Sequence, residues 1–399
     1  MPGTVKKVVL AYSGGLDTAV IIPWLKENYG CEVIAMAGDL GQGDELEGIR
    51  EKALATGASK VYVKDLRQEF VRDYLWKLVR TGAVYEGKYL LGTSIARPLL
   101  AKHQVEVALA EGADAVAHGC TGKGNDQVRL EVSVGALAPE LEVIAPIRDW
   151  SMSRQEEIEY AQQRNLPVNP GNSRFSVDEN LWGRSVEAGE LEDPWLEPPE
   201  EAYAWTSPPS ATPEQPAYLE IRFEEGIPTA VDGEDMAGPD LVRHLNSLAG
   251  SHGVGRADHV ENRLVGIKSR EVYEAPAAVV LHAAHQALEA MTLSREQART
   301  KARISQEYAD LVYNGLWYTA HRHDLDAYVH STQRHVTGQV RVRLHKGTCV
   351  VVGRNAVRSL YQYDLATYDR GDRFDQSAAP GFISIYGLPV RTQSQVQGE

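Results

Sequence analysis

The sequence has few cysteines and lacks the commonest nucleotide-binding signature. Its 399 residues include three cysteines, Cys31, Cys120 and Cys349, which are far apart in the chain. Their spacing fits neither a disulfide framework nor a metal-binding cluster, so we expect a cytoplasmic protein. No glycine-rich stretch ends in Gly-Lys-Ser or Gly-Lys-Thr, as a Walker phosphate loop would. Any nucleotide must therefore be bound by another kind of loop.

Long apolar runs and an excess of basic residues are missing as well. No run approaches the roughly 20 apolar residues that span a bilayer. Residues 1–20 carry no apolar segment with a signal-cleavage pattern, so we expect no membrane partner. Lys and Arg number 41 against 55 Asp and Glu, a formal net charge of −14. A general nucleic-acid binder usually has a basic surface, so no nucleic-acid partner is expected.

The chain begins with a strand, a glycine turn and a helix that together predict an anion site. Residues 5–11 are mostly apolar and partly β-branched, which is typical of a buried strand. Ser13-Gly14-Gly15 follows this run, and Asp17 stands where a helix N-cap is expected. Two adjacent glycines let backbone amides approach phosphate oxygens at the positive end of the helix dipole. The turn is not Gly-x-Gly-x-x-Gly, so no dinucleotide fold is expected; an ordinary strand-to-helix connection remains the alternative.

The first 167 residues alternate between strand-like and helix-like segments. Strands are predicted at 5–11, 32–37, 60–63, 114–118 and 142–146, and helices at 18–29, 44–56, 67–80, 97–111 and 154–164. Pro23 should kink the first helix, and Pro98 should lie in the first turn of its helix. The alternation predicts a parallel sheet with right-handed crossovers, whose ligands lie beyond the carboxyl ends of the strands. The loops at 13–17 and 119–129 both lie at such ends.

The second of these loops is rich in polar side chains. From residue 118 it reads His-Gly-Cys-Thr-Gly-Lys-Gly-Asn-Asp-Gln-Val-Arg. Asn125 or Asp126 can cap the next helix, and Arg129 faces the same end about one turn later. A flexible loop whose Asn and Asp only cap is the alternative. His118 and Cys120 are expected to be packing residues rather than catalysts, since no paired base is evident.

After about residue 165 the alternation stops. The proline-rich stretch 194–216 predicts an extended surface connection. Later elements are predicted as strands at 218–223, 228–231, 338–344 and 349–352, and as helices at 241–249, 276–291, 294–313 and after 321. The polar stretch 260–274 is typical of a solvated face. Four histidines between 321 and 335 lack the spacing of a zinc site.

Taken together, the motifs resemble the argininosuccinate synthase family along nearly the whole chain. Ser-Gly-Gly-Leu-Asp at 13–17 alone is shared with GMP synthetase, asparagine synthetase and tRNA-thiolating enzymes, which also split ATP into AMP and pyrophosphate. Its combination with Gly-Lys-Gly-Asn-Asp-Gln-Val-Arg at 122–129 is far more specific. The other matching stretches are 89–94, 118–119, 176 with 178–180, 253–256, 260–263, 268–270 and 381–383.

The resemblance implies an α/β protein in three parts. These are a parallel-sheet nucleotide-binding domain of the adenine nucleotide α-hydrolase-like kind at 1–167, an α+β synthetase domain at 168–360 and a C-terminal oligomerisation segment at 361–399. The implied enzyme is a homotetrameric ligase of arginine biosynthesis that joins citrulline to aspartate. It would use ATP with Mg²⁺, pass through a citrulline-adenylate, and release AMP and pyrophosphate. Pro389 stands in a tail that is shorter than expected for this assembly.

The resemblance also assigns residues to each substrate, motif by motif. For ATP they are Ala11, Tyr12, Ser13, Gly14, Gly15, Leu16, Asp17, Thr18, Ala19, Gly38 and Gly119. For citrulline they are Tyr89, Ser94, Asn125, Arg129, Ser176, Ser185, Glu261 and Tyr273, and for aspartate Thr121, Asn125 and Asp126. Asp17, Asp126 and Arg129 are the expected catalytic residues, and none is expected to hold a resident metal. A guanidinium such as that of Arg129 suits the citrulline carboxylate, because it can donate two parallel hydrogen bonds.

Some positions depart from the family pattern. Ala19 stands where Ser is usual, Glu271 where Gly is usual, and Gly38 and Cys120 where Ala is usual. The segment 274–283 also lacks expected residues. These departures leave open an ATP-binding regulatory protein of the same fold with impaired catalysis. A tRNA-modifying enzyme of the same loop class would need a basic face and cysteines placed for sulfur transfer, and the sequence offers neither.

Overall fold

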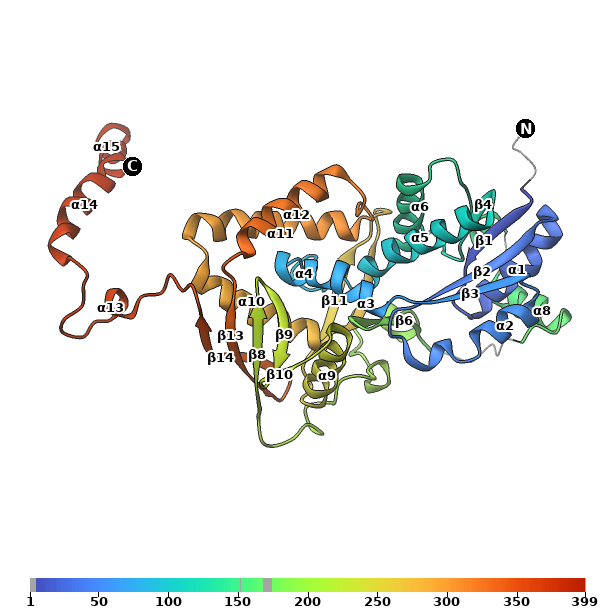
Figure 1. Cartoon of the computed structure of the whole chain (residues 1–399), viewed down its shortest axis with the longest axis horizontal. Coiled ribbons are helices and arrows are strands. Elements are labelled where there is room, and N and C mark those ends of the chain that lie inside the picture. Colours follow the sequence, from blue (N-terminus) through green and yellow to red (C-terminus); the bar gives the residue numbers. More distant parts are fainter. Residues whose placement is uncertain (1–4, 151, 168–173, 399) are drawn as a thin grey trace.

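A parallel five-stranded sheet forms the N-terminal part of the molecule (Figure 1). The computed structural model describes residues 5–150, 152–167 and 174–398. The strands are β1 (Lys7–Ala11), β2 (Glu32–Asp39), β3 (Lys60–Asp65), β4 (Ala115–Ala117) and β5 (Glu142–Ile144), in the order β3-β2-β1-β4-β5. All four strand pairs are parallel, as predicted.

Helices cover both faces of this sheet, which explains its continuous apolar strands. On one face, Val8 and Leu10 pack with α1 (Leu16–Tyr29), α2 (Ile49–Thr56) and α8 (Arg154–Gln163). On the other face, Val9 packs with α5 (Gly92–Glu111) and α6 (Asp126–Leu137). Two short helices complete this part, η1 (Gly43–Leu46) and α7 (Pro146–Asp149). The predicted parallel sheet with helical crossovers is confirmed.

The predicted N-cap of the first helix is wrong, and that of α6 is confirmed in part. Gly15 is the N-cap residue of α1, and Asp17 lies inside the first turn. The helix contains Pro23 and ends at Tyr29, as predicted. On α6 the N-cap residue is Asn125, but its side chain makes no capping bond, because that side chain is engaged across the cleft.

The start of α5 is set by a tyrosine outside the helix. The helix begins at Gly92, so Pro98 is an interior residue rather than a first-turn residue. The Tyr89 hydroxyl oxygen accepts the backbone N–H groups of Thr93 at 2.9 Å and Ser94 at 3.1 Å. These are donors that a helix leaves free at its N-terminus. A cap from outside the helix cannot be read from periodicity.

The helix predicted at 67–80 is present but irregular. It consists of α3 (Arg67–Glu69), a π-helical segment η2 (Phe70–Leu75) and α4 (Trp76–Thr81). Its buried side chains, such as Phe70 and Leu78, belong to the core of the C-terminal part rather than to that of the parallel sheet. This N-terminal segment therefore joins the two parts of the molecule through a shared core.

A second sheet lies within the C-terminal part and is antiparallel. Its strands are β8 (Ala217–Glu224), β9 (Ile227–Val231), β10 (Glu234–Asp235), β13 (Gly338–His345) and β14 (Thr348–Ala356), in the order β10-β9-β8-β13-β14. The accompanying helices are α9 (Gly238–Ser251), α10 (Pro276–Thr292), α11 (Arg295–Tyr313) and α12 (Ala320–Gln333). The four strands predicted in this part are confirmed, and they pair as two hairpins, β8 with β9 and β13 with β14.

A third sheet lies beside the cleft and was not predicted. Its strands are β6 (Ser176–Asn180), β7 (Gly183–Glu187), β11 (Arg256–Asn262) and β12 (Lys268–Glu274), in the antiparallel order β11-β12-β7-β6. The expectation of a solvated face at 260–274 is wrong for three residues that are buried. Glu261, Tyr273 and Glu274 are 3%, 7% and 0% exposed. Their side chains are covered by other elements: Glu261 accepts from Tyr313 of α11, Tyr273 stacks on Tyr89, and Glu274 binds the backbone at 204–206.

Glu274 anchors the proline-rich connection after β7. This connection contains only the short helices η3 (Gly189–Glu192) and η4 (Glu200–Ala202). The buried carboxylate accepts the backbone N–H groups of Ala204, Trp205 and Thr206 at 2.8–2.9 Å. It also accepts the Thr206 hydroxyl at 2.6 Å and lies 3.1 Å from an Arg184 nitrogen. A connection without long elements is thereby held against the third sheet.

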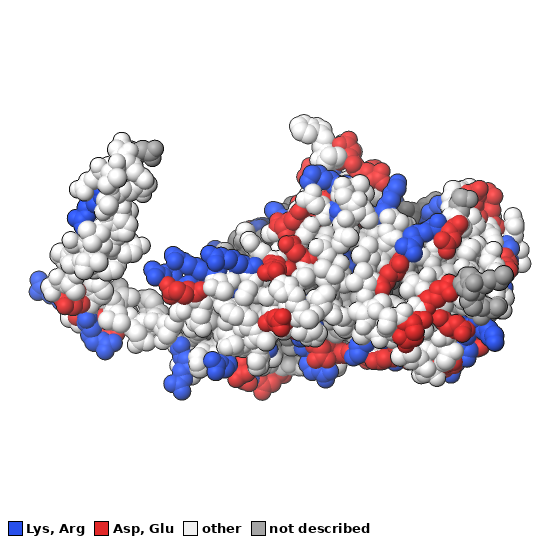
Figure 2. All heavy atoms as spheres, turned by 90° about the horizontal axis from the view of Figure 1, so that it is seen from above, with Lys and Arg blue, Asp and Glu red and all other residues white. Residues whose placement is uncertain are grey.

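The last segment extends away from the body (Figure 1). It contains α13 (Tyr363–Ala366), η5 (Gln376–Ala378), α14 (Ala379–Tyr386) and α15 (Leu388–Gln397). Much of the face of this segment seen in Figure 2 is white, and side chains such as Phe382, Ile385 and Val390 are 64–71% exposed. Among the described residues, every helix is too short or too polar to cross a bilayer.

We expect Glu274→Gln to destabilise the protein by about 3 kcal/mol, because an amide cannot satisfy Arg184 and the converging donors together. Thermal unfolding measures this as a midpoint several degrees lower. Glu197→Gln, an exposed change in the same connection, is the matched control. Equal midpoints for the two variants would show that Glu274 does not anchor the connection.

Candidate active site

A cleft of about 470 Å³ opens at the carboxyl ends of β1, β2 and β4, facing the third sheet. It gathers most of the residues assigned from the sequence. Those that line it are Ala11, Tyr12, Ser13, Asp17, Thr18, Gly38, Tyr89, Gly119, Thr121, Asn125, Asp126, Arg129, Ser176, Ser185, Glu261 and Tyr273. The assigned residues that do not line it are Gly14, Gly15, Leu16, Ala19 and Ser94. Leu16 and Ala19 are buried, at 7% and 0% exposure.

The loop after β1 is shaped to present backbone amides. Gly14 has a φ of +79°, a conformation that side chains disfavour. The Ser13 hydroxyl lies 3.1 Å from that of Thr18, which in turn donates to the Gly15 carbonyl at 3.3 Å. The first amides of α1 have no partners within the helix, so they and these hydroxyls are suited to binding an anion at the cleft wall.

Two carboxyl groups meet beside this loop. Asp17 lines the cleft and accepts a hydrogen bond from Arg154 at 3.1 Å. Glu157, 6% exposed, lies behind it on α8. Burial and then the nearby Asp17 charge raise the pKa of Glu157 to about 7. Sequence reasoning did not identify this second carboxyl group.

An apolar slot lies at the end of β2. It is lined by Met36, Gly38, Leu40 and Leu100. A Cβ atom at Gly38 would come within 2.6 Å of the Leu100 side chain and 2.8 Å of that of Leu66. The absence of a side chain at Gly38 therefore lets these leucines close the slot, whose apolar walls suit a flat aromatic ring.

Asp126 is held between two arginines. Arg97 donates to one carboxylate oxygen at 2.9 Å and Arg129 to the other at 2.8 Å. Burial alone would raise the pKa of Asp126, but the two guanidinium charges outweigh it and hold the pKa below its usual range. Asp126 therefore stays ionised, which suits a role in binding a cation rather than in accepting a proton.

Arg97 and Asp178 are parts of this network that sequence reasoning missed. Arg97 also donates to Asp178 at 2.5 Å, and both line the cleft. Burial raises the pKa of Asp178 in spite of this partner. The sequence placed Arg97 beside the matching stretch 89–94 and Asp178 within 176–180, and this was the only indication that they belong to the site. Neither position showed by itself that the two side chains meet.

Arg129 has one donor group left free. It is 4% exposed, and its Nε donates to the Tyr313 carbonyl at 2.8 Å while Nη1 binds Asp126. The buried Nη2 has no hydrogen-bond partner among the described residues. A buried donor without a partner is costly, so this nitrogen fits an acceptor that a ligand brings.

Glu261 is a buried carboxylate that lacks a cation. Its two oxygens accept the hydroxyls of Tyr273 at 2.6 Å and Tyr313 at 2.5 Å. Within the described part of the chain, no Lys or Arg forms an ion pair with it. A carboxylate in such a place fits an ammonium supplied by a ligand. The unused Nη2 of Arg129 and this carboxylate therefore offer complementary charges to the two ends of an amino-acid head group.

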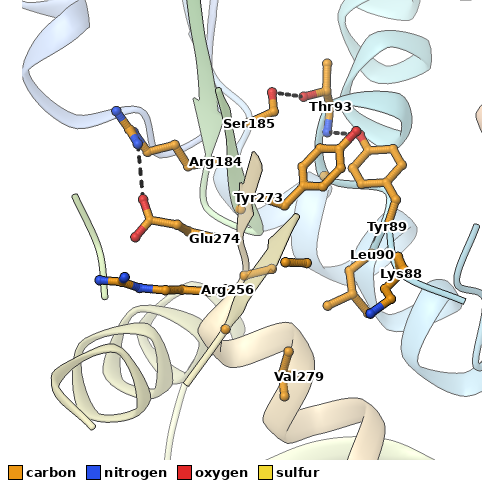
Figure 3. Close-up of a pocket in the computed structure, with 15 residues that line it drawn as sticks. Lys88, Tyr89, Leu90, Thr93, Arg184, Ser185, Arg256, Tyr273, Glu274 and Val279 are labelled. Carbon is orange, nitrogen blue, oxygen red and sulfur yellow. Dashed lines mark hydrogen bonds and ion pairs between the residues drawn. The ribbon is translucent and has the colours of Figure 1, made fainter. Parts of the chain in front are cut away.

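Tyrosine rings and hydroxyls form the wall beside Glu261. Tyr89 and Tyr273 stack with ring centroids 4.3 Å apart, and the Thr93 hydroxyl lies 3.3 Å from that of Ser185 (Figure 3). Ser94 is buried outside the cleft, where its hydroxyl donates to Tyr89 at 3.2 Å. A smaller pocket of about 50 Å³ shares parts of this wall, and it has room for little more than water.

Comparison with known proteins matches the chain over almost its entire length. Residues 7–167 match the family model described as the arginosuccinate synthase N-terminal HUP domain, and residues 175–393 match that of the C-terminal domain. The argininosuccinate synthase of Dehalococcoides mccartyi is 56% identical over 98% of this chain and 97% of its own length. That of Gloeobacter violaceus is 57% identical over 98% and 99%, and that of Roseiflexus castenholzii 53% over the full length of both.

We expect Arg97→Met to destabilise the protein by about 2 kcal/mol, because it leaves Asp178 without its cation and Asp126 with one instead of two. The double variant Arg97→Met/Asp178→Asn should regain part of the loss, since one uncompensated charge is removed. Denaturant unfolding compares the two. A double variant no more stable than the single one would contradict this account of the network.

Proposed function

The chain belongs to the argininosuccinate synthase family, and from that premise we propose how its cleft divides among three substrates. As a member of this ligase family, it joins citrulline to aspartate with ATP and forms argininosuccinate, AMP and pyrophosphate. The reaction belongs to arginine biosynthesis. Nothing in the structure or the comparisons favours an impaired regulatory protein.

We assign ATP to the wall formed by the parallel sheet. The amides of 13–18, with the Ser13 and Thr18 hydroxyls, suit the β- and γ-phosphates that leave as pyrophosphate. The slot at Gly38 and Leu100 suits adenine, and the backbone at Gly119 suits the ribose. Ala11, Tyr12, Leu16 and Ala19 support this loop as its flanking residues.

Mg²⁺ is expected to accompany the phosphates, and the carboxyl pair beside the loop fits it. Mg²⁺ sites typically combine one or two carboxylates with substrate phosphates and water. Asp17 faces the cleft with Glu157 behind it, so Asp17, supported by Glu157, would hold the ion. Among the described residues no group of three or more His, Cys, Asp or Glu side chains is placed to hold a metal ion. When bound, Mg²⁺ neutralises part of the phosphate charge.

The citrulline assignment depends on two buried groups that line the cleft. Glu261 has no cation as a partner, and Nη2 of Arg129 has no hydrogen-bond acceptor among the described residues. The citrulline carboxylate would bind Nη2 of Arg129, and the ammonium would bind Glu261. Tyr89, Tyr273, Asn125, Ser176 and Ser185 would surround the rest, with Ser94 acting through Tyr89. A head group fixed at this end directs the ureido group toward the nucleotide.

Aspartate is assigned to the neighbouring loop, where Thr121, Asn125 and Asp126 line the cleft. Because the two arginines keep Asp126 ionised, it would hold the aspartate ammonium close to the activated carbon. In this role Asp126 binds the ammonium and does not act as a strong base. Arg97 keeps this carboxylate in place.

The chemistry follows from this placement. The ureido oxygen of citrulline forms a bond to the α-phosphorus as the bond to pyrophosphate breaks. The aspartate amine then attacks the former ureido carbon, and AMP leaves with the oxygen. Both steps depend mainly on alignment and charge stabilisation, which fixed amides and arginines supply.

We also propose three functional parts, at 1–167, 168–360 and 361–399, in a cytoplasmic homotetramer. The separate matches at 7–167 and 175–393 support the first boundary. The extended segment after β14, with its exposed apolar side chains, supports contacts with other copies. Analytical ultracentrifugation of the full chain and of a chain ending at 360 would test this assembly.

We expect pyrophosphate release from ATP and Mg²⁺ to require citrulline, and argininosuccinate to form only when aspartate is also present. A coupled pyrophosphate assay with each amino acid omitted in turn measures both requirements. ATP binding without citrulline-dependent release of pyrophosphate would instead support the impaired regulatory protein.

Arg129→Lys should raise the citrulline KM by about 10- to 100-fold, because one ammonium cannot serve Tyr313, Asp126 and a substrate carboxylate at once. Steady-state kinetics at saturating ATP and aspartate provide the measurement. Arg148→Lys is the control, since Arg148 pairs with Glu131 outside the cleft lining. An unchanged citrulline KM in Arg129→Lys would refute the carboxylate role.

A further inference from the structure

We propose that Tyr313 is a positioning residue that fixes the two halves of the citrulline head-group site relative to each other. Tyr313 is the last residue of α11 and is 1% exposed. In the sequence it is indistinguishable from an ordinary core residue. It does not line the cleft, yet it contacts three residues assigned to citrulline. This inference rests on the proposed citrulline site. It adds to that site a residue that determines the specificity for an α-amino acid.

The Tyr313 hydroxyl joins Glu261 to Asn125. It donates to Glu261 at 2.5 Å and accepts from the Asn125 amide nitrogen at 2.8 Å. The amide oxygen of Asn125 accepts the backbone N–H of Leu264 at 2.9 Å, which fixes the orientation of the amide. Since Asn125 must donate, the single hydroxyl proton of Tyr313 is directed to Glu261. The Tyr313 hydroxyl can therefore donate only to Glu261, and this hydrogen bond orients the carboxylate.

The backbone of Tyr313 holds Arg129. Its carbonyl accepts the Arg129 Nε at 2.8 Å, and the guanidinium carbon lies 4.8 Å from the centre of its ring. Gly315, at a φ of +77°, brings the following turn so close that a Cβ would lie 2.8 Å from the Arg129 Cα. The same residue therefore positions the partner of the ammonium and the partner of the carboxylate.

Tyr313 is itself clamped. The ring of Tyr85 stacks on it with centroids 3.6 Å apart and planes 7° apart. The Tyr85 hydroxyl donates to the carbonyl of Asn262, the residue after Glu261, at 2.8 Å. Burial and then the Glu261 charge raise the pKa of Tyr313 above its ordinary value, so the hydroxyl keeps its proton. Neither rotation nor ionisation readily removes the donor from Glu261.

The consequence concerns which ligands the cleft prefers. An α-amino acid presents its ammonium and carboxylate at one fixed separation, and the site has to match that separation to use both. Loss of the Tyr313 hydroxyl frees Glu261 on one side and Asn125 on the other, while the carbonyl still holds Arg129. Recognition of the ammonium should then weaken more than recognition of the carboxylate.

The test compares citrulline with 5-ureidopentanoate, which is citrulline without its α-ammonium. The measured quantity is the ratio of the inhibition constant of the analogue to the citrulline KM. In Tyr313→Phe we expect this ratio to fall by about 10-fold or more, with the ATP KM changed by less than about 2-fold. General damage to the site would weaken both ligands together and leave the ratio unchanged.

Two variants frame this result. Tyr308→Phe removes a buried hydroxyl from the same helix, where it donates to Asp326 at 2.8 Å, and should keep the wild-type ratio. Glu261→Gln should lower the ratio if Glu261 receives the ammonium. A lowered ratio in Glu261→Gln with a wild-type ratio in Tyr313→Phe would overturn the role of Tyr313 alone. Wild-type ratios in both would overturn the citrulline assignment with it.

A second perturbation keeps the hydroxyl and removes its clamp. Tyr85→Leu deletes the ring that stacks on Tyr313, and Tyr85 does not line the cleft. We expect a smaller fall of the same ratio than in Tyr313→Phe. If Tyr313→Phe folds poorly, an unchanged ratio in Tyr85→Leu contradicts the proposal, and a lowered ratio supports it.

Discussion

Two buried charged groups that the protein does not fully satisfy dictate what the cleft can accept. Asp126 has two arginines, whereas Glu261 has only phenol hydroxyls and Arg129 keeps a buried donor free. Leaving such groups unmatched is costly, and Glu261 and Arg129 both line the cleft, where a ligand can complete them. A zwitterionic amino acid brings an ammonium for Glu261 and a carboxylate for the free donor of Arg129. This pairing places the substrate before any reacting atom is considered.

The fold supplies the rigidity that these charges need. The parallel sheet delivers the loops after β1 and β4 to one edge, and the third sheet brings Glu261 and Tyr273 to face them. The segment from α3 to α4 leaves the N-terminal part and packs into the core of the C-terminal part. The cleft walls are therefore held by a shared core, and the turn after α11 ties one wall to the other.

The sequence predicted well where the structure is set by local apolar patterns. The run at 5–11, the glycine turn after it and the alternation that follows were enough to place the loops at 13–17 and 119–129 at one sheet edge. The start of α5 was missed, because its cap is Tyr89 rather than a residue in the helix. Glu261 was hidden in a polar stretch, since side-chain contacts with Tyr273 and Tyr313, and not local composition, bury it. Arg97 and Tyr313 act through contacts between distant elements, which no local pattern contains.

Tracing the ureido oxygen of citrulline into AMP tests most directly whether the cleft aligns this oxygen with the α-phosphorus of ATP. Citrulline labelled with ¹⁸O in its ureido group is turned over with ATP, Mg²⁺ and aspartate, and the AMP is analysed by mass spectrometry. If the cleft aligns the ureido oxygen with the α-phosphorus, the label appears in the phosphate of AMP, one ¹⁸O for each argininosuccinate formed. Unlabelled AMP alongside argininosuccinate would contradict the adenylate route and the placement of citrulline from which it follows.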